Sequence, residues 1–294
     1  MRLLLAAALV LSTGPLLAAQ AVPPAPSAPA APAAPAAPDE SLPPGEAAAA
    51  SALNRSPRHG EFIDVPGGAG EAALRAFIVY PERKDPAGVV IVIHEIFGLT
   101  DWIRSVADQL AEDGFIAIAP DFLSGKGPGG KGTEALANRD EAVKLVRELT
   151  PAEVNRRLDA VRAYASKLPA GNGRLATLGF CWGGARSFGY AAAQPALDAA
   201  VVFYGTAPEV ADLATVKAPV LGLYGGDDAR VNATIPATEA ELTKRGRTYE
   251  VHVYDGAGHG FLRAQDGRDG ANLKATQQGW PRVVAFLRQH LAKR

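Results

Sequence analysis

Short apolar segments alternate with amphipathic segments along most of the chain. Segment 89–93 is apolar at every position, which is typical of a strand covered on both faces. Seven more segments are expected to be strands: 61–65, 74–80, 115–119, 174–178, 199–204, 219–224 and 248–254. Most of the intervening segments carry apolar residues at helical spacing or helix-capping signals. Helices are therefore expected at 100–114, 140–149, 150–168, 183–193, 233–245 and 273–291.

This alternation predicts the fold class. Strands that alternate with helices form right-handed crossovers and a mostly parallel central sheet with helices on both faces, which is an α/β fold. No helix is expected between the strands at 61–65 and 74–80, so this pair is expected to be antiparallel at one edge of the sheet. Residues 55–294 are expected to form a single domain.

The first residues have the pattern of a targeting segment. Arg2 precedes an apolar run over 3–11, and Ala19-Gln20-Ala21 provides a small-x-small cleavage site. This combination predicts a signal peptide over 1–21 and a periplasmic or secreted protein. A membrane anchor is the alternative, but the run is short and Gly14-Pro15 interrupts it.

The next segment, 22–54, consists largely of Ala and Pro. Its first part in particular has no periodic apolar pattern that could bury enough surface to fold. We therefore expect a disordered linker between the signal peptide and the domain.

Composition narrows the possible functions. The formal net charge of the chain is -1, so nothing in it favours nucleic acid as a partner. No His-Glu-x-x-His motif or cysteine cluster is present, so no metal or other cofactor is implied. A monomer that acts on a small molecule, with no membrane span once the signal peptide is removed, is expected. The one cysteine, Cys181, cannot form a disulfide within the chain and is a candidate reactive thiol.

Cys181 lies in the sequence Gly179-Phe180-Cys181-Trp182-Gly183-Gly184, between an expected strand and an expected helix. This matches the nucleophile elbow, in which glycines allow a tight turn that raises the nucleophile above the sheet. The alternative is a glycine-rich turn around a buried cysteine. The amino terminus of the next helix is expected to favour a thiolate.

An acid and a histidine follow in the order that this elbow requires. Asp227 and Asp228 come just after the strand at 219–224, and either could orient a histidine. His259 follows the strand at 248–254 between two glycines, a position that packing does not explain. These residues predict a nucleophile, a base and an orienting carboxylate at one edge of the sheet.

Four motifs together resemble the dienelactone hydrolase (carboxymethylenebutenolidase) family of α/β-hydrolases. They are the cysteine elbow, His94-Glu95-Ile96-Phe97-Gly98, Asp228-Ala229-Arg230-Val231 and Gly258-His259-Gly260-Phe261. The resemblance extends from about residue 59 to 290. The position of Asp228 in its motif favours it over Asp227 as the partner of His259.

The resemblance implies roles for four more positions. Glu95 would contact the resting thiol and take part in its activation. The backbone amides of Ile96 and Trp182 would form the oxyanion hole, which agrees with one donor following the nucleophile and one following a central strand. Arg263 would bind a substrate carboxylate. A second substrate-binding arginine has no recognisable counterpart in the Gly-rich segment 121–130.

The sequence therefore predicts a hydrolase that cleaves a small ester or lactone through Cys181, His259 and Asp228, with an acyl-enzyme intermediate. Three alternatives use the same triad: a thioesterase, an acyltransferase and a peptide-like hydrolase. A non-catalytic binding protein of the cell envelope is a further alternative, because a fold alone does not establish an activity.

Overall fold

The computed structural model describes residues 39–68 and 72–292. The expected signal peptide and the first part of the expected linker lie outside these residues. The described part contains an eight-stranded sheet with strand order β1-β2-β4-β3-β5-β6-β7-β8. The strands are β1 (Gly60–Val65), β2 (Leu74–Val79), β3 (Ala87–Ile93), β4 (Ile116–Pro120), β5 (Gly171–Phe180), β6 (Ala199–Phe203), β7 (Val220–Gly225) and β8 (Tyr249–Tyr254).

The direction of the strands agrees with the prediction. Strands β4, β3, β5, β6, β7 and β8 pair in parallel. Strand β2 pairs antiparallel with both β1 and β4, so the antiparallel pair forms one edge. The carboxyl ends of the six parallel strands therefore meet at one edge of the sheet, where sheets of this kind build their sites. The predicted α/β-hydrolase fold is confirmed.

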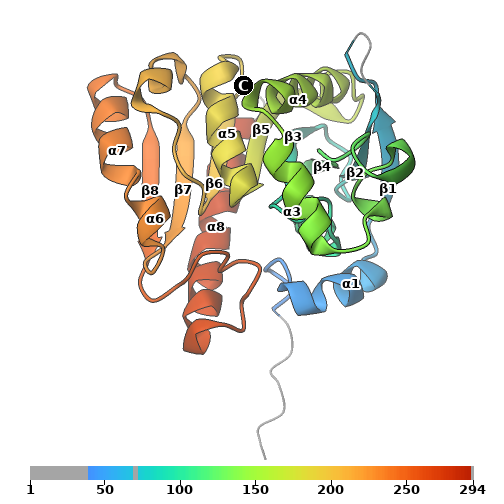
Figure 1. Cartoon of the computed structure of the whole chain (residues 1–294), viewed down its shortest axis with the longest axis horizontal. Helices are drawn as coiled ribbons and strands as arrows, with labels where there is room; N and C mark the ends of the chain where they lie inside the picture. The colour runs from blue at the N-terminus through green and yellow to red at the C-terminus, as the bar shows by residue number, and fades with distance from the viewer. Residues whose placement is uncertain (1–38, 69–71, 293–294) are drawn as a thin grey trace, which may run out of the picture. The chain divides into compact units, whose positions relative to one another are not determined.

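Helices cover both faces of the sheet. They are α1 (Glu46–Arg55), α2 (Asp101–Glu112), α3 (Arg139–Glu148), α4 (Pro151–Ala165), α5 (Trp182–Ala193), α6 (Ala229–Asn232), α7 (Ile235–Lys244) and α8 (Ala271–Leu291). In Figure 1, α5 lies in front of the sheet and α8 lies behind it.

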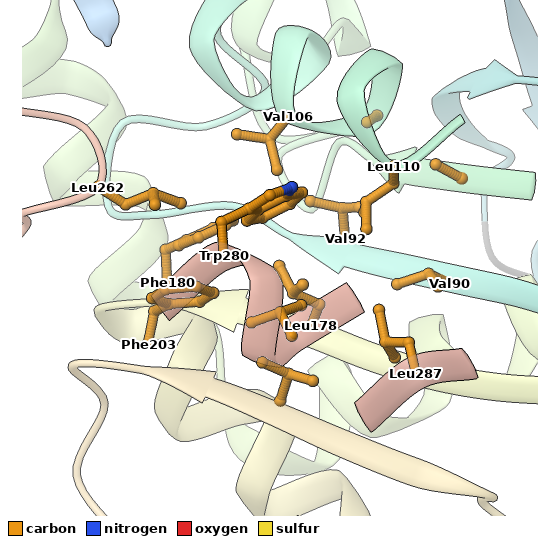
Figure 2. Packing of buried hydrophobic residues seen from close by; sticks show 14 of the residues in the cluster. Val90, Val92, Val106, Leu110, Leu178, Phe180, Phe203, Leu262, Trp280 and Leu287 are labelled. Carbon is orange, nitrogen blue, oxygen red and sulfur yellow. The ribbon is translucent and has the colours of Figure 1, made fainter. Parts of the chain in front are cut away.

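The side chains of β3 show why this strand is apolar throughout. Val90 and Val92 point into one core with α2 and α8, whereas Val89, Ile91 and Ile93 point into a second core with α4 and α5. Figure 2 shows the first core, where Trp280 of α8 packs among side chains from the sheet and from α2. Both faces of the strand are thus buried, and alternate residues supply the two cores.

Helix α1 corrects the predicted domain boundary. The linker was expected to extend to residue 54, but the last part of that range forms α1. Its Ala49 is 1% exposed and packs in the same core as α2. Short helices gain most of their stability from such packing, which an alanine-rich sequence does not reveal.

None of the helices within residues 39–68 and 72–292 has both the length and the apolar character needed to cross a bilayer.

Candidate active site

Cys181 lies at the sharp turn between β5 and α5. Its backbone has φ 55° and ψ -115°, a region that non-glycine residues rarely adopt. The flanking glycines make this turn possible. A Cβ atom on Gly179 would lie 2.0 Å from the carbonyl oxygen of Gly183, and one on Gly183 would lie 2.3 Å from that of Ile93. Strain of this kind is common at functional sites, and here it holds the sulfur at the edge where β5 ends.

The structure distinguishes between the two candidate acids. Nδ1 of His259 is 2.5 Å from Oδ2 of Asp228, a strong charge-assisted hydrogen bond. Asp227 instead forms an ion pair with Arg268, at 3.0 Å, on the surface. The Asp228 side chain is largely buried, so it can hold the imidazole in one orientation with Nε2 free to handle protons.

Tyr204 is a buried neighbour of His259 and Glu95. It follows β6, is fully buried and has a positive φ of 39°. Its ring centroid lies 5.1 Å from that of His259 in an edge-on contact. Burial, and then the nearby charge of Glu95, hold the pKa of its hydroxyl well above the usual range. The ends of β3, β5 and β6 and the loops after β7 and β8 thus bring these residues to one edge of the sheet.

Burial determines the resting state of the Cys181 sulfur. Burial, and then the charge of Glu95, raise the pKa of the thiol to about 11, so the resting group is protonated. The backbone amide of Trp182 lowers the pKa of the thiol, as expected at the start of α5. This effect is smaller than the effects of burial and the Glu95 charge, so the helix terminus favours a thiolate as expected but does not outweigh them.

Glu95 is almost completely buried next to a cation. Nε of Arg263 lies 2.8 Å from Oε2 of Glu95. Burial raises the pKa of Glu95 to about 7, although the positive charge of Arg263 opposes this shift. A carboxyl group with such a pKa can accept or release a proton near neutral pH.

This shift predicts a pH-dependent stability. The folded state holds the Glu95 proton up to about pH 7, whereas the unfolded chain releases it near the ordinary value of 4.5. The free energy of unfolding should therefore fall by about 3 kcal/mol as pH rises across this window. Urea unfolding of the wild type and of Glu95→Gln at pH 4.5 and pH 8 measures the effect. The contribution of Glu95 is the difference between the two proteins in the free energy of unfolding at each pH. A difference that does not change with pH would show that Glu95 ionises normally.

The two expected oxyanion-hole positions follow the neighbouring strands β5 and β3. Trp182 begins α5, and Ile96 follows Glu95 in the loop after β3. His94 fixes that loop: its Nδ1 is 2.6 Å from the Glu95 carbonyl oxygen, and its Nε2 accepts the Phe122 amide at 3.1 Å. Burial lowers the pKa of His94, in keeping with a neutral ring in this structural position.

Three residues near the site were not predicted. Tyr204 follows a strand that ends between those of Cys181 and Asp228, a position that could have drawn attention to it. Glu46 of α1 and Arg139 of α3 lie far from the motifs in the sequence; Glu46 forms ion pairs with both Arg263 and Arg139. No local pattern in the sequence marks these two residues.

A nucleophile turn after a central strand, with an aspartate and a histidine after later parallel strands, defines the class of α/β-hydrolases. A sequence profile of the dienelactone hydrolase family matches residues 74–291. The chain belongs to the dienelactone hydrolase family.

Individual relatives agree with this membership. A carboxymethylenebutenolidase of Pseudomonas putida is 33% identical over 193 residues, which cover 63% of this chain and 80% of the relative. A protein of Saccharolobus solfataricus, named "Putative carboxymethylenebutenolidase", is 32% identical and covers 74% of this chain and 95% of its own length. A crystal structure from Klebsiella pneumoniae, described as a "Putative Dienelactone Hydrolase", is 31% identical with a TM-score of 0.69, covering 79% of this chain and 99% of the other. The chain is therefore a dienelactone hydrolase-like enzyme that acts on a small molecule, and the alternative of a non-catalytic binding protein is set aside.

Proposed function

We propose that the enzyme hydrolyses a small ester or lactone in two steps, with Cys181 as nucleophile, His259 as base and Asp228 as the orienting acid. The observation that carries this proposal is the 2.5 Å contact between His259 and Asp228, together with a cysteine that is held at a strained turn between β5 and α5 and whose thiol feels the charge of Asp228. Each triad member comes from the end of a different strand, so the sheet fixes their relative positions.

In the first step, the sulfur of Cys181 attacks the carbonyl carbon. The thiol proton passes to Glu95, whose pKa of about 7 suits it to act as a base. The amides of Ile96 and Trp182 stabilise the oxyanion, a contribution of about 3 kcal/mol for one donor. The tetrahedral intermediate expels the alkoxide, which takes the proton that Glu95 received from the thiol, and leaves an acyl group on the sulfur.

In the second step, His259 takes a proton from water while Asp228 stabilises the resulting imidazolium. The hydroxide attacks the thioester, and the same amides stabilise the second oxyanion. The sulfur leaves and takes the proton that His259 removed from water, which returns the neutral thiol of the resting protein. For a lactone, the alcohol and the acid are released as a single molecule.

The proposal predicts an acyl group on one residue. The enzyme is mixed with 4-nitrophenyl acetate, quenched in acid and analysed by intact and peptide mass spectrometry. His259→Gln should accumulate an acetyl group on the Cys181 peptide, because deacylation loses its base. His252→Gln is the matched control, since His252 lies on β8 and pairs with Glu250 instead, and it should resemble the wild type.

Acetyl on a different residue, or rapid turnover by His259→Gln with no labelled cysteine, would contradict the proposed roles.

A further inference from the structure

Arg263, expected to bind a substrate carboxylate, already holds a carboxylate from its own chain. Nη1 of Arg263 lies 2.7 Å from Oε2 of Glu46, and Arg139 forms an ion pair with the other oxygen of the same group. The guanidinium carbons of Arg263 and Arg139 lie 5.3 and 4.9 Å from the centroid of the Phe97 ring. Two arginines that both lie over one aromatic ring therefore hold the Glu46 carboxylate, an arrangement suited to binding an anion.

The backbone around Glu46 is anchored to the domain. The amide of Glu46 donates to the carbonyl of Arg263 at 2.9 Å. The carbonyl of Pro43 accepts from Gln265 at 2.8 Å, and that of Pro44 accepts from the indole of Trp102 at 3.1 Å. The position of Glu46 is therefore fixed by main-chain hydrogen bonds as well as by its ion pairs with the arginines.

This cluster is continuous with the reacting groups. Arg263 contacts Glu46 and Glu95 with different nitrogens of one guanidinium, at 2.7 and 2.8 Å. Glu95 is in turn close enough to Cys181 for its charge to raise the pKa of the thiol. Although partial burial raises the pKa of Glu46, the hydrogen bonds and charges of the two arginines hold it below the usual range. Glu46 is thus a permanent anion at neutral pH, one arginine away from Glu95.

We propose that Glu46 is a specificity-determining residue that fills a two-arginine carboxylate subsite, so that the enzyme accepts uncharged esters or lactones and rejects those carrying a carboxylate at this position. The inference rests on the proposed function, since it names the substrate class of the same site. An incoming carboxylate would find both arginines occupied, and it would be repelled by Glu46 and by ionised Glu95.

Binding of a free carboxylate tests the subsite without any chemistry. Succinate is titrated by calorimetry into Cys181→Ala and into the double variant that also carries Glu46→Gln. The glutamine should release Arg139 and the Nη1 end of Arg263, and should increase the affinity for succinate at least tenfold. Adding Arg263→Met should abolish the gain. Glu148→Gln is the matched control, because Glu148 is exposed at the end of α3, and it should leave the affinity unchanged.

Paired substrates test the same point during turnover. One is the anionic ester 4-nitrophenyl hydrogen succinate, and the other is 4-nitrophenyl butyrate, a neutral ester with an acyl chain of the same carbon count. The ratio of kcat/KM for the anionic ester to kcat/KM for the neutral ester should be well below one in the wild type. This ratio should rise at least tenfold in Glu46→Gln, whereas Glu148→Gln should leave it as it is in the wild type.

The outcomes separate this inference from the proposed function. Micromolar binding of succinate to Cys181→Ala overturns the inference even if Glu46→Gln does not fold, because it shows that the arginines are available in the natural sequence. An unchanged ratio and affinity in folded Glu46→Gln, with butyrate ester hydrolysis retained, also overturns it and leaves the proposed function intact. If the wild type hydrolyses neither ester, but Glu46→Gln still increases the affinity of Cys181→Ala for succinate, the proposed function is overturned and the filled subsite is supported.

Discussion

Cys181→Ala should lower kcat for an aryl ester by at least about 10⁴-fold, because no other group can form the acyl intermediate. The remaining triad members and the oxyanion amides would still bind the substrate, so KM should change much less. Initial rates with 4-nitrophenyl acetate measure the loss. The variant should keep its fold, because alanine removes one half-buried sulfur from the edge of a core.

Circular dichroism and thermal unfolding of Cys181→Ala provide the control. A folded variant that keeps more than a tenth of the wild-type activity would show that the sulfur is not the nucleophile. The elbow would then be a tight structural turn, and the mechanism would have to be assigned to other residues.

The pair of adjacent aspartates allows a second sharp test. Asp228→Asn should lower kcat by roughly 10⁴-fold, because an amide cannot stabilise the imidazolium and can hold His259 in the wrong tautomer. Asp227→Asn removes the same charge one residue earlier, where the carboxylate pairs with exposed Arg268. An exposed ion pair contributes little, so this control should stay within about twofold of the wild type.

Equal losses in the two variants would indicate a general effect of charge in the turn after β7. A larger loss in Asp227→Asn would mean that the resting contact between His259 and Asp228 is not the one used in catalysis.

Local patterns were sufficient to predict most of the fold. The uninterrupted apolar run at 89–93 is β3, with alternate residues in two cores. The antiparallel edge formed by β1 and β2 could be predicted because no helical segment separates them. The role of the glycines around Cys181 could be predicted because it is steric and depends on a motif of only six residues.

The parts that were missed depend on contacts over long distances in the chain. Glu46 and Arg263 are 217 residues apart, and only the folded domain brings them together. Helix α1 was expected to be linker because its alanines carry no strong apolar stripe, and its stability comes from the surfaces that cover it. How far burial and the Glu95 charge outweigh the helix terminus at Cys181 could not be predicted for a related reason, since both are properties of tertiary structure.

The neutral state of Cys181 also affects how quickly the thiol is oxidised. Peroxide attacks the thiolate, and a pKa of about 11 leaves roughly one sulfur in ten thousand ionised at pH 7. Sulfenic acid should therefore form slowly in the absence of substrate. Under oxidising conditions, such a protected thiol would remain usable where a permanently ionised one would be lost to oxidation.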